Sequence, residues 1–212
     1  MIPFHAVIFD MDGLMLDTES IARLAMQKAG EELGHPIDDA VFRSFIGRTT
    51  ADTEARMREL YGSDFSTSHF WERTDWHWNE HVAREGIAHK VGLKELMTYL
   101  EGRGLRKAIA TSSRRPDALR KLGPLVERFE VLVTGDEVTR GKPAPDIFLL
   151  AAQRLGVNPG KCLVLEDSHA GLQAAKAAGM HAIMVPDLLP PPADVVQVCA
   201  SLHEVQKWLE RA

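Results

Sequence analysis

The sequence predicts an α/β fold in which a parallel sheet carries helices on both faces and a helical segment is inserted into the chain. Three observations support this prediction. Five short runs rich in Val and Ile are apolar almost throughout, which is typical of strands buried on both faces. Helix-like stretches separate most of these runs, and several of them end at Gly, a common helix-stop residue. One long stretch after the first run contains helical patterns and no strand.

The expected elements follow one another in a regular order. The strand-like runs lie at 5–10, 106–112, 130–136, 161–167 and 181–187. The helix-like stretches of the same part of the chain lie at 91–104, 115–129, 145–156 and 169–179, and a last helix at 202–212 follows a Pro-rich connection at 188–195. Alternating strands and helices build a parallel sheet. We therefore expect a Rossmann-like α/β core.

The stretch from 17 to 83 breaks this alternation. Helical patterns lie at 20–34, 38–47, 50–62 and 68–85, one after another. We therefore expect two domains, an α/β core made of 1–16 and 84–212 and a helical domain made of 17–83. Asp17 and Thr18 open the first of these helices, and a hinge and N-cap role is expected for them.

Composition excludes several classes of partner. The formal net charge is −5 and no long block of Lys and Arg occurs, which argues against nucleic acid or an anionic membrane as the main partner. The two cysteines, Cys162 and Cys199, form neither a disulfide framework nor a CxxC pair, which favours a reducing compartment. The first apolar run is too short for a signal peptide or a membrane span. We expect a cytoplasmic protein.

Polar residues that could carry chemistry stand where the predicted strands end. In open parallel sheets, ligands bind beyond the carboxyl ends of the strands. The residues at these ends, with a lysine from the following segment, are Asp10, Asp12, Thr111, Ser112, Lys142, Glu166 and Asp167. Carboxylates hold Mg²⁺, while a hydroxyl and an ammonium hold phosphate oxygens. This set indicates Mg²⁺-dependent phosphoryl transfer.

Asp10 and Asp12 are two residues apart, so on an extended strand end both side chains point to the same side. One carboxylate can attack phosphorus, and the other can donate and accept a proton. Gly13 permits a sharp turn directly afterwards. The alternative is a plain strand-end turn with a helix cap, and the other strand-end groups argue against it.

These motifs together resemble the haloacid dehalogenase superfamily of phosphohydrolases. The matching stretches are FDMDG at 9–13, AIATSS at 108–113, GKPAPDIF at 141–148 and VLEDSHAG at 164–171. The resemblance covers nearly the whole chain and includes the helical insertion, which in that family is a mobile cap over the active site. The most similar members have a four-helix cap and include β-phosphoglucomutase and relatives that hydrolyse small sugar phosphates.

The resemblance implies roles for the residues that react with phosphate. Asp10 is implied as the nucleophile and Asp12 as the general acid and base. Thr111 and Lys142 are implied to hold the phosphoryl group, with Ser112 assisting. Family members that dehalogenate lack the second aspartate and need no metal, so Asp12 favours phosphate chemistry.

The resemblance also implies a Mg²⁺ site. Its ligands are implied to be Asp10, the main-chain carbonyl of Asp12, and Asp167. Glu166 is implied to bind through water or to orient the other ligands.

The helical insertion offers fewer signals. Arg48 stands where related caps contact substrate, and it could bind a second phosphate or a sugar hydroxyl or could be an ordinary surface arginine. The segment that begins at Lys90 resembles a hinge of the family, but Val91 replaces the usual proline, which affects only the expected hinge geometry.

One competing motif lies in the insertion. The sequence from His77 to His81 matches H-x-x-E-H, a zinc metalloprotease pattern. The pattern is short and no third ligand is placed nearby, so we do not expect zinc. Trp71, Trp76 and Trp78 are expected in a packed helical core, and the two histidines are expected at the surface, solvated or hydrogen-bonded.

The leading hypothesis is therefore a Mg²⁺-dependent phosphatase that hydrolyses a small phosphorylated metabolite through an aspartyl-phosphate. One alternative is a phosphosugar mutase of the β-phosphoglucomutase type, which uses the same core residues. Another is a non-catalytic binding protein on the same fold. We expect a monomer without nucleic-acid or membrane partners.

Overall fold

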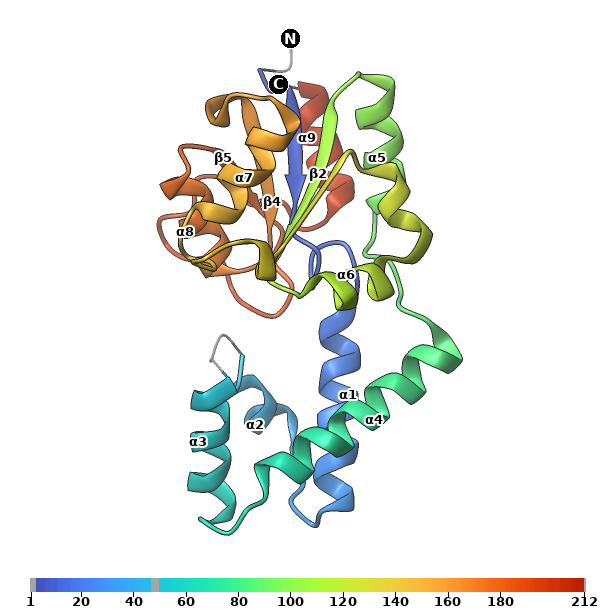
Figure 1. Cartoon of the computed structure of the whole chain (residues 1–212), viewed down its shortest axis with the longest axis vertical. Coiled ribbons are helices and arrows are strands. Elements are labelled where there is room, and N and C mark those ends of the chain that lie inside the picture. Colours follow the sequence, from blue (N-terminus) through green and yellow to red (C-terminus); the bar gives the residue numbers. More distant parts are fainter. Residues whose placement is uncertain (1–2, 47–49, 212) are drawn as a thin grey trace. The chain divides into compact units, whose positions relative to one another are not determined.

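A computed structural model describes residues 3–46 and 50–211 (Figure 1). The chain divides into two compact units, unit 1 with Met1–Leu16 and His89–Ala212, and unit 2 with Asp17–Ala88. Unit 2 ends at Ala88 rather than at the predicted residue 83, because helix α4 continues to Glu85.

Unit 1 contains a five-stranded sheet in the order β3-β2-β1-β4-β5, and every neighbouring pair is parallel. The strands are β1 Ala6–Phe9, β2 Arg106–Thr111, β3 Val131–Thr134, β4 Cys162–Glu166 and β5 His181–Met184. They fall within the five predicted runs. The central strand β1 is buried along its whole length, as its continuous apolar sequence requires. The predicted α/β fold class is confirmed.

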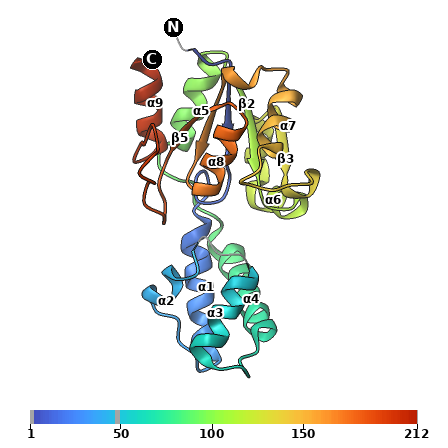
Figure 2. The ribbon, with the colours of Figure 1, turned by 90° about the vertical axis from the view of Figure 1, so that its left-hand side faces the viewer.

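Helices cover both faces of this sheet (Figure 2). Ile8 is in register with Ala108 on one side and Val164 on the other, and all three pack in one core cluster with Phe148 and Ala174. The helices of unit 1 are α5 Leu93–Gly102, α6 Arg115–Leu122, α7 Asp146–Leu155, α8 His169–Ala177 and α9 Leu202–Arg211. Helices α7 and α8 cover the face of Ile8, and α5 and α9 lie together on the other side of the sheet. Three short 3-10 helices, η1 Gly123–Arg128, η2 Gly135–Glu137 and η3 Pro159–Lys161, complete the unit.

Unit 2 is helical in its described residues. Its helices are α1 Thr18–Glu32, α2 Asp39–Arg43, α3 Thr50–Tyr61 and α4 Thr67–Glu85. They enclose a separate core of Met26, Ala29, Ile37, Phe42, Phe45, Met57, Phe65 and Phe70. Asp17 occupies the N-cap position of α1 as expected, but its side chain makes no capping hydrogen bond. No helix in the described part of the chain is long and apolar enough to cross a membrane.

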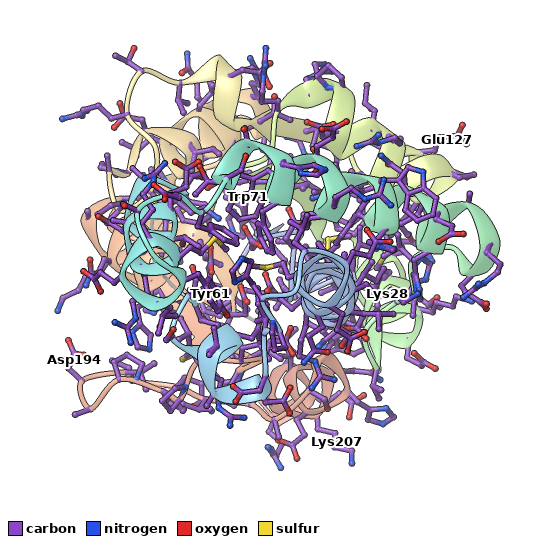
Figure 3. All side chains as sticks on the ribbon, turned by 90° about the horizontal axis from the view of Figure 1, so that it is seen from below. Lys28, Tyr61, Trp71, Glu127, Asp194 and Lys207 are labelled. Carbon is purple, nitrogen blue, oxygen red and sulfur yellow. The ribbon has the colours of Figure 1, made fainter. Side chains whose placement is uncertain are left out.

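Trp71 of α4 packs against the helical core as predicted, whereas Trp76 and His77 differ from their predicted places. Trp76 is 48% exposed, and the guanidinium carbon of Arg73 lies 4.5 Å from its ring centroid. His77 is buried, and its Nε2 lies 3.1 Å from Oε1 of Glu32 on α1. In residues 3–46 and 50–211, no group of three His, Cys, Asp or Glu side chains is arranged to hold a metal ion. Packing between α1 and α4, rather than residue type, decides which side chains are buried. Figure 3 shows the side chains and labels Tyr61 and Trp71 in this unit.

Gly92 lies close to the backbone of α9, so a substitution at this position tests the packing of α5 against α9. Its φ is +87°, and a Cβ there would lie 2.2 Å from the backbone nitrogen of His203. Gly104 has a comparable φ of +66°, but no atom lies within 4 Å of the position of its Cβ. Gly104→Ala should cost about 1–2 kcal/mol, the penalty of a left-handed side-chain residue. Gly92→Ala should cost a further 1–3 kcal/mol or so, because the backbone of α9 must move. Urea unfolding of both variants measures the difference, and equal losses would contradict the packing described.

Candidate active site

The order of the strands brings the predicted site residues to one edge of the sheet. Strands β2, β1 and β4 are neighbours and parallel, so the residues that end them lie side by side (Figure 1). The backbone N–H of Asp10 donates to the carbonyl of Leu165 at 3.0 Å, which continues the pairing of β1 with β4 by one residue. Asp10 is therefore held next to Glu166, and Thr111 ends the neighbouring strand β2.

Lys142 occupies the centre of this group. Its Nζ lies 2.5 Å from Oδ1 of Asp10 and 2.6 Å from Oε1 of Glu166, and it also donates to the carbonyl of Ala110 at 3.1 Å. The three charged side chains are almost completely buried, with 6% of Lys142, 10% of Asp10 and none of Glu166 exposed. Buried charges of this kind must be paired, because each is costly to remove from water. The predicted association of Asp10, Lys142 and Glu166 is thus present in the structure.

Glu166 is fixed from both sides. Its second oxygen, Oε2, accepts hydrogen bonds from the backbone N–H and the hydroxyl of Ser168, at 2.9 and 2.8 Å. Gly171 lies against the same carboxylate and leaves no room for a Cβ, which would be 1.8 Å from Oε1. Since both oxygens already have partners, these contacts favour an orienting role for Glu166 over direct binding of a metal.

The two buried carboxylates share one ammonium, and the pKa values reflect this. Burial raises the pKa of Asp10 to about 7, the Lys142 charge opposes the rise, and the negative charges of Glu166 and Asp12 add to it. Burial alone would lower the pKa of Lys142, but the charges of Asp10 and Glu166 raise it overall, so the ammonium stays charged. The edge of the sheet therefore has an excess of negative charge, which a further cation would neutralise.

Asp12 has a different set of partners. Its Oδ1 accepts from Nζ of Lys121 on α6 at 2.8 Å, and its Oδ2 accepts from the hydroxyl of Ser113 at 2.8 Å. The backbone N–H of Ser113 in turn donates to the hydroxyl of Thr111 at 3.1 Å. The side chain of Asp12 is 26% exposed, so it remains accessible. This arrangement links the predicted proton carrier to the predicted phosphate-binding threonine.

Sequence reasoning missed two partners of Asp12, Ser113 and Lys121, and the predicted contact of Ser112 with phosphate, through its backbone or its hydroxyl, remains a prediction. The side chain of Ser112 is exposed, whereas that of Ser113 points back to Asp12. The two serines are adjacent and follow the last residue of β2, so the sequence did not show which one the turn directs inward. Lys121 carried no motif, and only the docking of α6 places it beside Asp12.

The residues at this edge of the sheet carry oxygen atoms, which are suitable ligands for a hard divalent cation. A Cβ on Gly13 would lie 2.4 Å from Oδ2 of Asp167 and 3.4 Å from Oδ2 of Asp187, so both oxygens face the α-carbon of Gly13. Oδ2 of Asp187 is buried and has no hydrogen-bond partner among residues 3–46 and 50–211, which marks an unmet acceptor beside Asp167. Carboxylate and carbonyl oxygens are the ligands that Mg²⁺ prefers. The oxygen donors are of the kind that Mg²⁺ binds, although the described side chains do not already form a group of three ligands.

The remaining predicted residues have different outcomes. Arg48 lies outside the described residues. Lys90 lies in unit 1, where its Nζ donates to Oδ1 of Asp187 at 2.7 Å, and Val91, in place of the proline of the resembling family, is 74% exposed. Sequence reasoning missed Asp187, which shows no motif beyond its place after the last strand.

The fold and the charged groups at the ends of its strands define a hydrolase of the parallel α/β type. Residues 7–185 match the family described as haloacid dehalogenase-like hydrolase, and the chain therefore belongs to this family. The prediction of an enzyme of this family is confirmed.

Individual relatives cover most of the chain. It is 34% identical to a phosphorylated carbohydrates phosphatase of Thermotoga maritima over 84% of this chain and 83% of that one. It is 30% identical to a β-phosphoglucomutase of Bacillus subtilis over 85% of this chain and 82% of that one. Among solved structures, a HAD family hydrolase of Deinococcus radiodurans with bound phosphate and sodium superposes with a TM-score of 0.84, at 28% identity over 100% of this chain and 97% of that one.

The charge at Asp10 should destabilise the metal-free protein at neutral pH. The pKa of Asp10 is raised from 3.8 to about 7, so the folded state favours the protonated carboxyl and loses stability as the pH rises from about 4 to above 7. Asp10→Asn replaces the carboxylate by a neutral group of the same shape. It should raise the Tm at pH 8 by about 2 °C or more, which corresponds to about 1 kcal/mol for a chain of this size.

The measurement is thermal unfolding in the presence of EDTA at pH 8 and at pH 5. The gain should shrink at pH 5, where Asp10 is mostly protonated. A variant that is less stable than the natural protein at pH 8 would contradict the assigned charge balance.

Proposed function

We propose that the protein is a Mg²⁺-dependent phosphatase that hydrolyses a small phosphate monoester through an aspartyl-phosphate on Asp10. The observation that carries this proposal is the lysine held between Asp10 and Glu166 at the sheet edge, with Asp12 two residues further on. The relative named phosphorylated carbohydrates phosphatase supports a phosphorylated sugar or a similar metabolite as the substrate.

The first step transfers the phosphoryl group to the protein. A carboxylate oxygen of Asp10 forms a bond to phosphorus, and the bond from phosphorus to the ester oxygen breaks with its electron pair going to that oxygen. Asp12 gives its proton to the leaving oxygen, so that an alcohol departs. Lys142 and Thr111 hold the phosphoryl oxygens, on which charge accumulates in the transition state.

The second step returns the enzyme to its starting state. Asp12, now ionised, takes a proton from a water molecule that attacks phosphorus on the side opposite Asp10. The bond from phosphorus to Asp10 breaks, which restores the carboxylate and releases inorganic phosphate. Asp12 is again protonated and ready for the next substrate.

Asp10, Asp167 and the carbonyl of Asp12 are the residues proposed to hold Mg²⁺, with Glu166 orienting Lys142 and the shell around the ion. When bound, the ion neutralises charge on the phosphoryl oxygens and offsets the repulsion between Asp10 and the substrate. The excess negative charge that raises the pKa of Asp10 supports this proposal.

A phosphosugar mutase is the second candidate, because the chain is 30% identical to a β-phosphoglucomutase. A mutase returns the phosphoryl group to a sugar rather than to water. Incubation with β-glucose 1-phosphate and its bisphosphate activator separates the two activities, since a mutase yields an isomeric sugar phosphate and a phosphatase yields inorganic phosphate. Arg48 remains a predicted substrate contact, and Arg48→Ala should raise KM for the substrate found in this way.

A non-catalytic binding protein on the same fold is disfavoured, since every position expected to act in catalysis holds a competent residue. The monomeric state and the cytoplasmic location remain predictions.

The catalytic roles can be tested with an alkyl phosphate and Mg²⁺, because the leaving oxygen of an alkyl ester needs a proton. Asp10→Asn should abolish turnover, because an amide cannot attack phosphorus. Asp12→Ala should lower kcat by about 10²–10⁴-fold, the usual size of a general acid–base contribution. Asp194→Asn, at an 80% exposed carboxylate elsewhere in unit 1, is the matched control. Near-normal rates in Asp10→Asn would refute the assignment, provided that circular dichroism shows the variant folded.

Lys121 should position Asp12. Lys121→Met removes the hydrogen bond from Lys121 to the carboxylate of Asp12, so kcat/KM for an alkyl phosphate should fall by about 10- to 100-fold, as expected for a misplaced catalytic group. An aryl phosphate should be affected less, because its leaving oxygen needs no proton. Lys121→Arg keeps the charge and should restore much of the rate. Equal losses of kcat/KM on both substrates would show that Lys121 does not act through Asp12 in the first step.

A further inference from the structure

Asp187 carries an unusual buried carboxylate. It follows the last strand β5, and its side chain is only 14% exposed. One oxygen, Oδ1, accepts from Nζ of Lys90 at 2.7 Å, but the other, Oδ2, is buried without a hydrogen-bond partner in the part of the chain that the structure describes. An unmet buried acceptor costs about 1–3 kcal/mol, and more when it is charged. Such a cost in a native fold calls for an explanation.

The direction in which Oδ2 of Asp187 points explains why this acceptor is left unmet. Oδ2 of Asp187 and Oδ2 of Asp167 lie 3.4 and 2.4 Å from the same point, where Gly13 would carry its Cβ. Gly13 has a φ of +78° and no side chain, so no side-chain atom of this residue lies between the two carboxylates. Two carboxylates that face one point repel each other unless a cation or a donor lies near them. Asp167 is the residue proposed to bind Mg²⁺ from this side.

We propose that Asp187 is a positioning residue of the divalent-cation site, and that its Oδ2 accepts a hydrogen bond from a water ligand of the ion. This inference rests on the Mg²⁺ site of the proposed function. Mg²⁺ keeps several of its waters in proteins, and outer carboxylates orient them. The salt bridge to Lys90 already neutralises part of the charge of Asp187, which suits an acceptor for water better than a direct ligand.

Lys90 keeps the carboxylate in this orientation. Its backbone N–H donates to the carbonyl of Met15 at 2.9 Å, and its neighbour His89 forms a bridge with Leu16. The backbone of Lys90 is therefore tied to the loop that follows β1 and contains Gly13. Lys90 holds Oδ1 of Asp187, which leaves Oδ2 turned toward Asp167.

The test measures metal binding without turnover. Full-length protein is titrated with Mn²⁺ alone and followed by electron paramagnetic resonance, and Mg²⁺ binding is measured by calorimetry. Asp187→Asn should weaken binding by about 10- to 100-fold, the usual effect of removing an outer partner of a metal ligand. Lys90→Met should weaken it less, and Lys90→Arg should restore it. Asp194→Asn is the control in the same part of the chain, and its exposed carboxylate lies on an outer loop of unit 1 (Figure 3).

Thermal unfolding gives a second readout. The rise in Tm on adding Mg²⁺ should be smaller for Asp187→Asn than for the natural protein, because ligand stabilisation depends on the dissociation constant. If Asp187→Asn does not fold, the same measurements are made on Lys90→Met. This variant keeps the carboxylate of Asp187 and removes only its salt bridge to Lys90.

The outcomes separate this inference from the proposed function. If Asp167→Asn loses metal while Asp187→Asn binds as the natural protein does, the role of Asp187 is overturned and the Mg²⁺ site stands. If the natural protein binds neither ion, or Asp167→Asn binds normally, the Mg²⁺ site itself fails and the role of Asp187 fails with it.

Discussion

The ammonium of Lys142 between the carboxylates of Asp10 and Glu166 is the interaction on which the site depends. The three groups come from the end of β1, the end of β4 and the segment before α7, and they meet only because β1 and β4 are neighbours in a parallel sheet. All three are buried, so none of the charges can be left without its partner at small cost. The same interaction fixes the side chain proposed to attack phosphorus.

The charges around Lys142 remain unbalanced, with an excess of negative charge. This excess lowers the stability of the metal-free protein and is also part of the proposed reaction. Lys142 serves two carboxylates, whereas Asp12 and Asp187 each have a lysine of their own, Lys121 and Lys90. Burial and the neighbouring negative charges raise the pKa of Asp10, so the metal-free site is less favourable than a neutral one. Active sites commonly retain such unfavourable charge because the reaction uses it. Here a divalent cation would offset the excess negative charge.

Some contacts could not be predicted where two elements meet. The hydroxyl of Ser113 reaches Asp12 because of the turn after β2 and not because of its residue type. Trp76 is exposed and His77 is buried, because the packing of α4 against α1 places the smaller, polar ring inside, next to Glu32. In each case the composition of the segment is compatible with both arrangements.

By itself, the sequence determined the class of fold and most of the charged groups at the sheet edge, because continuous apolar runs specify buried strands and polar residues at their ends are unusual. It also indicated the family, whose four motifs stand in order along the chain. Only the tertiary structure decided which carboxylate pairs with which lysine. Lys121, Lys90 and Asp187 lie far in sequence from the residues that they serve. Their roles depend on how α6 and the segments around β1 and β5 pack in three dimensions, which no local pattern encodes.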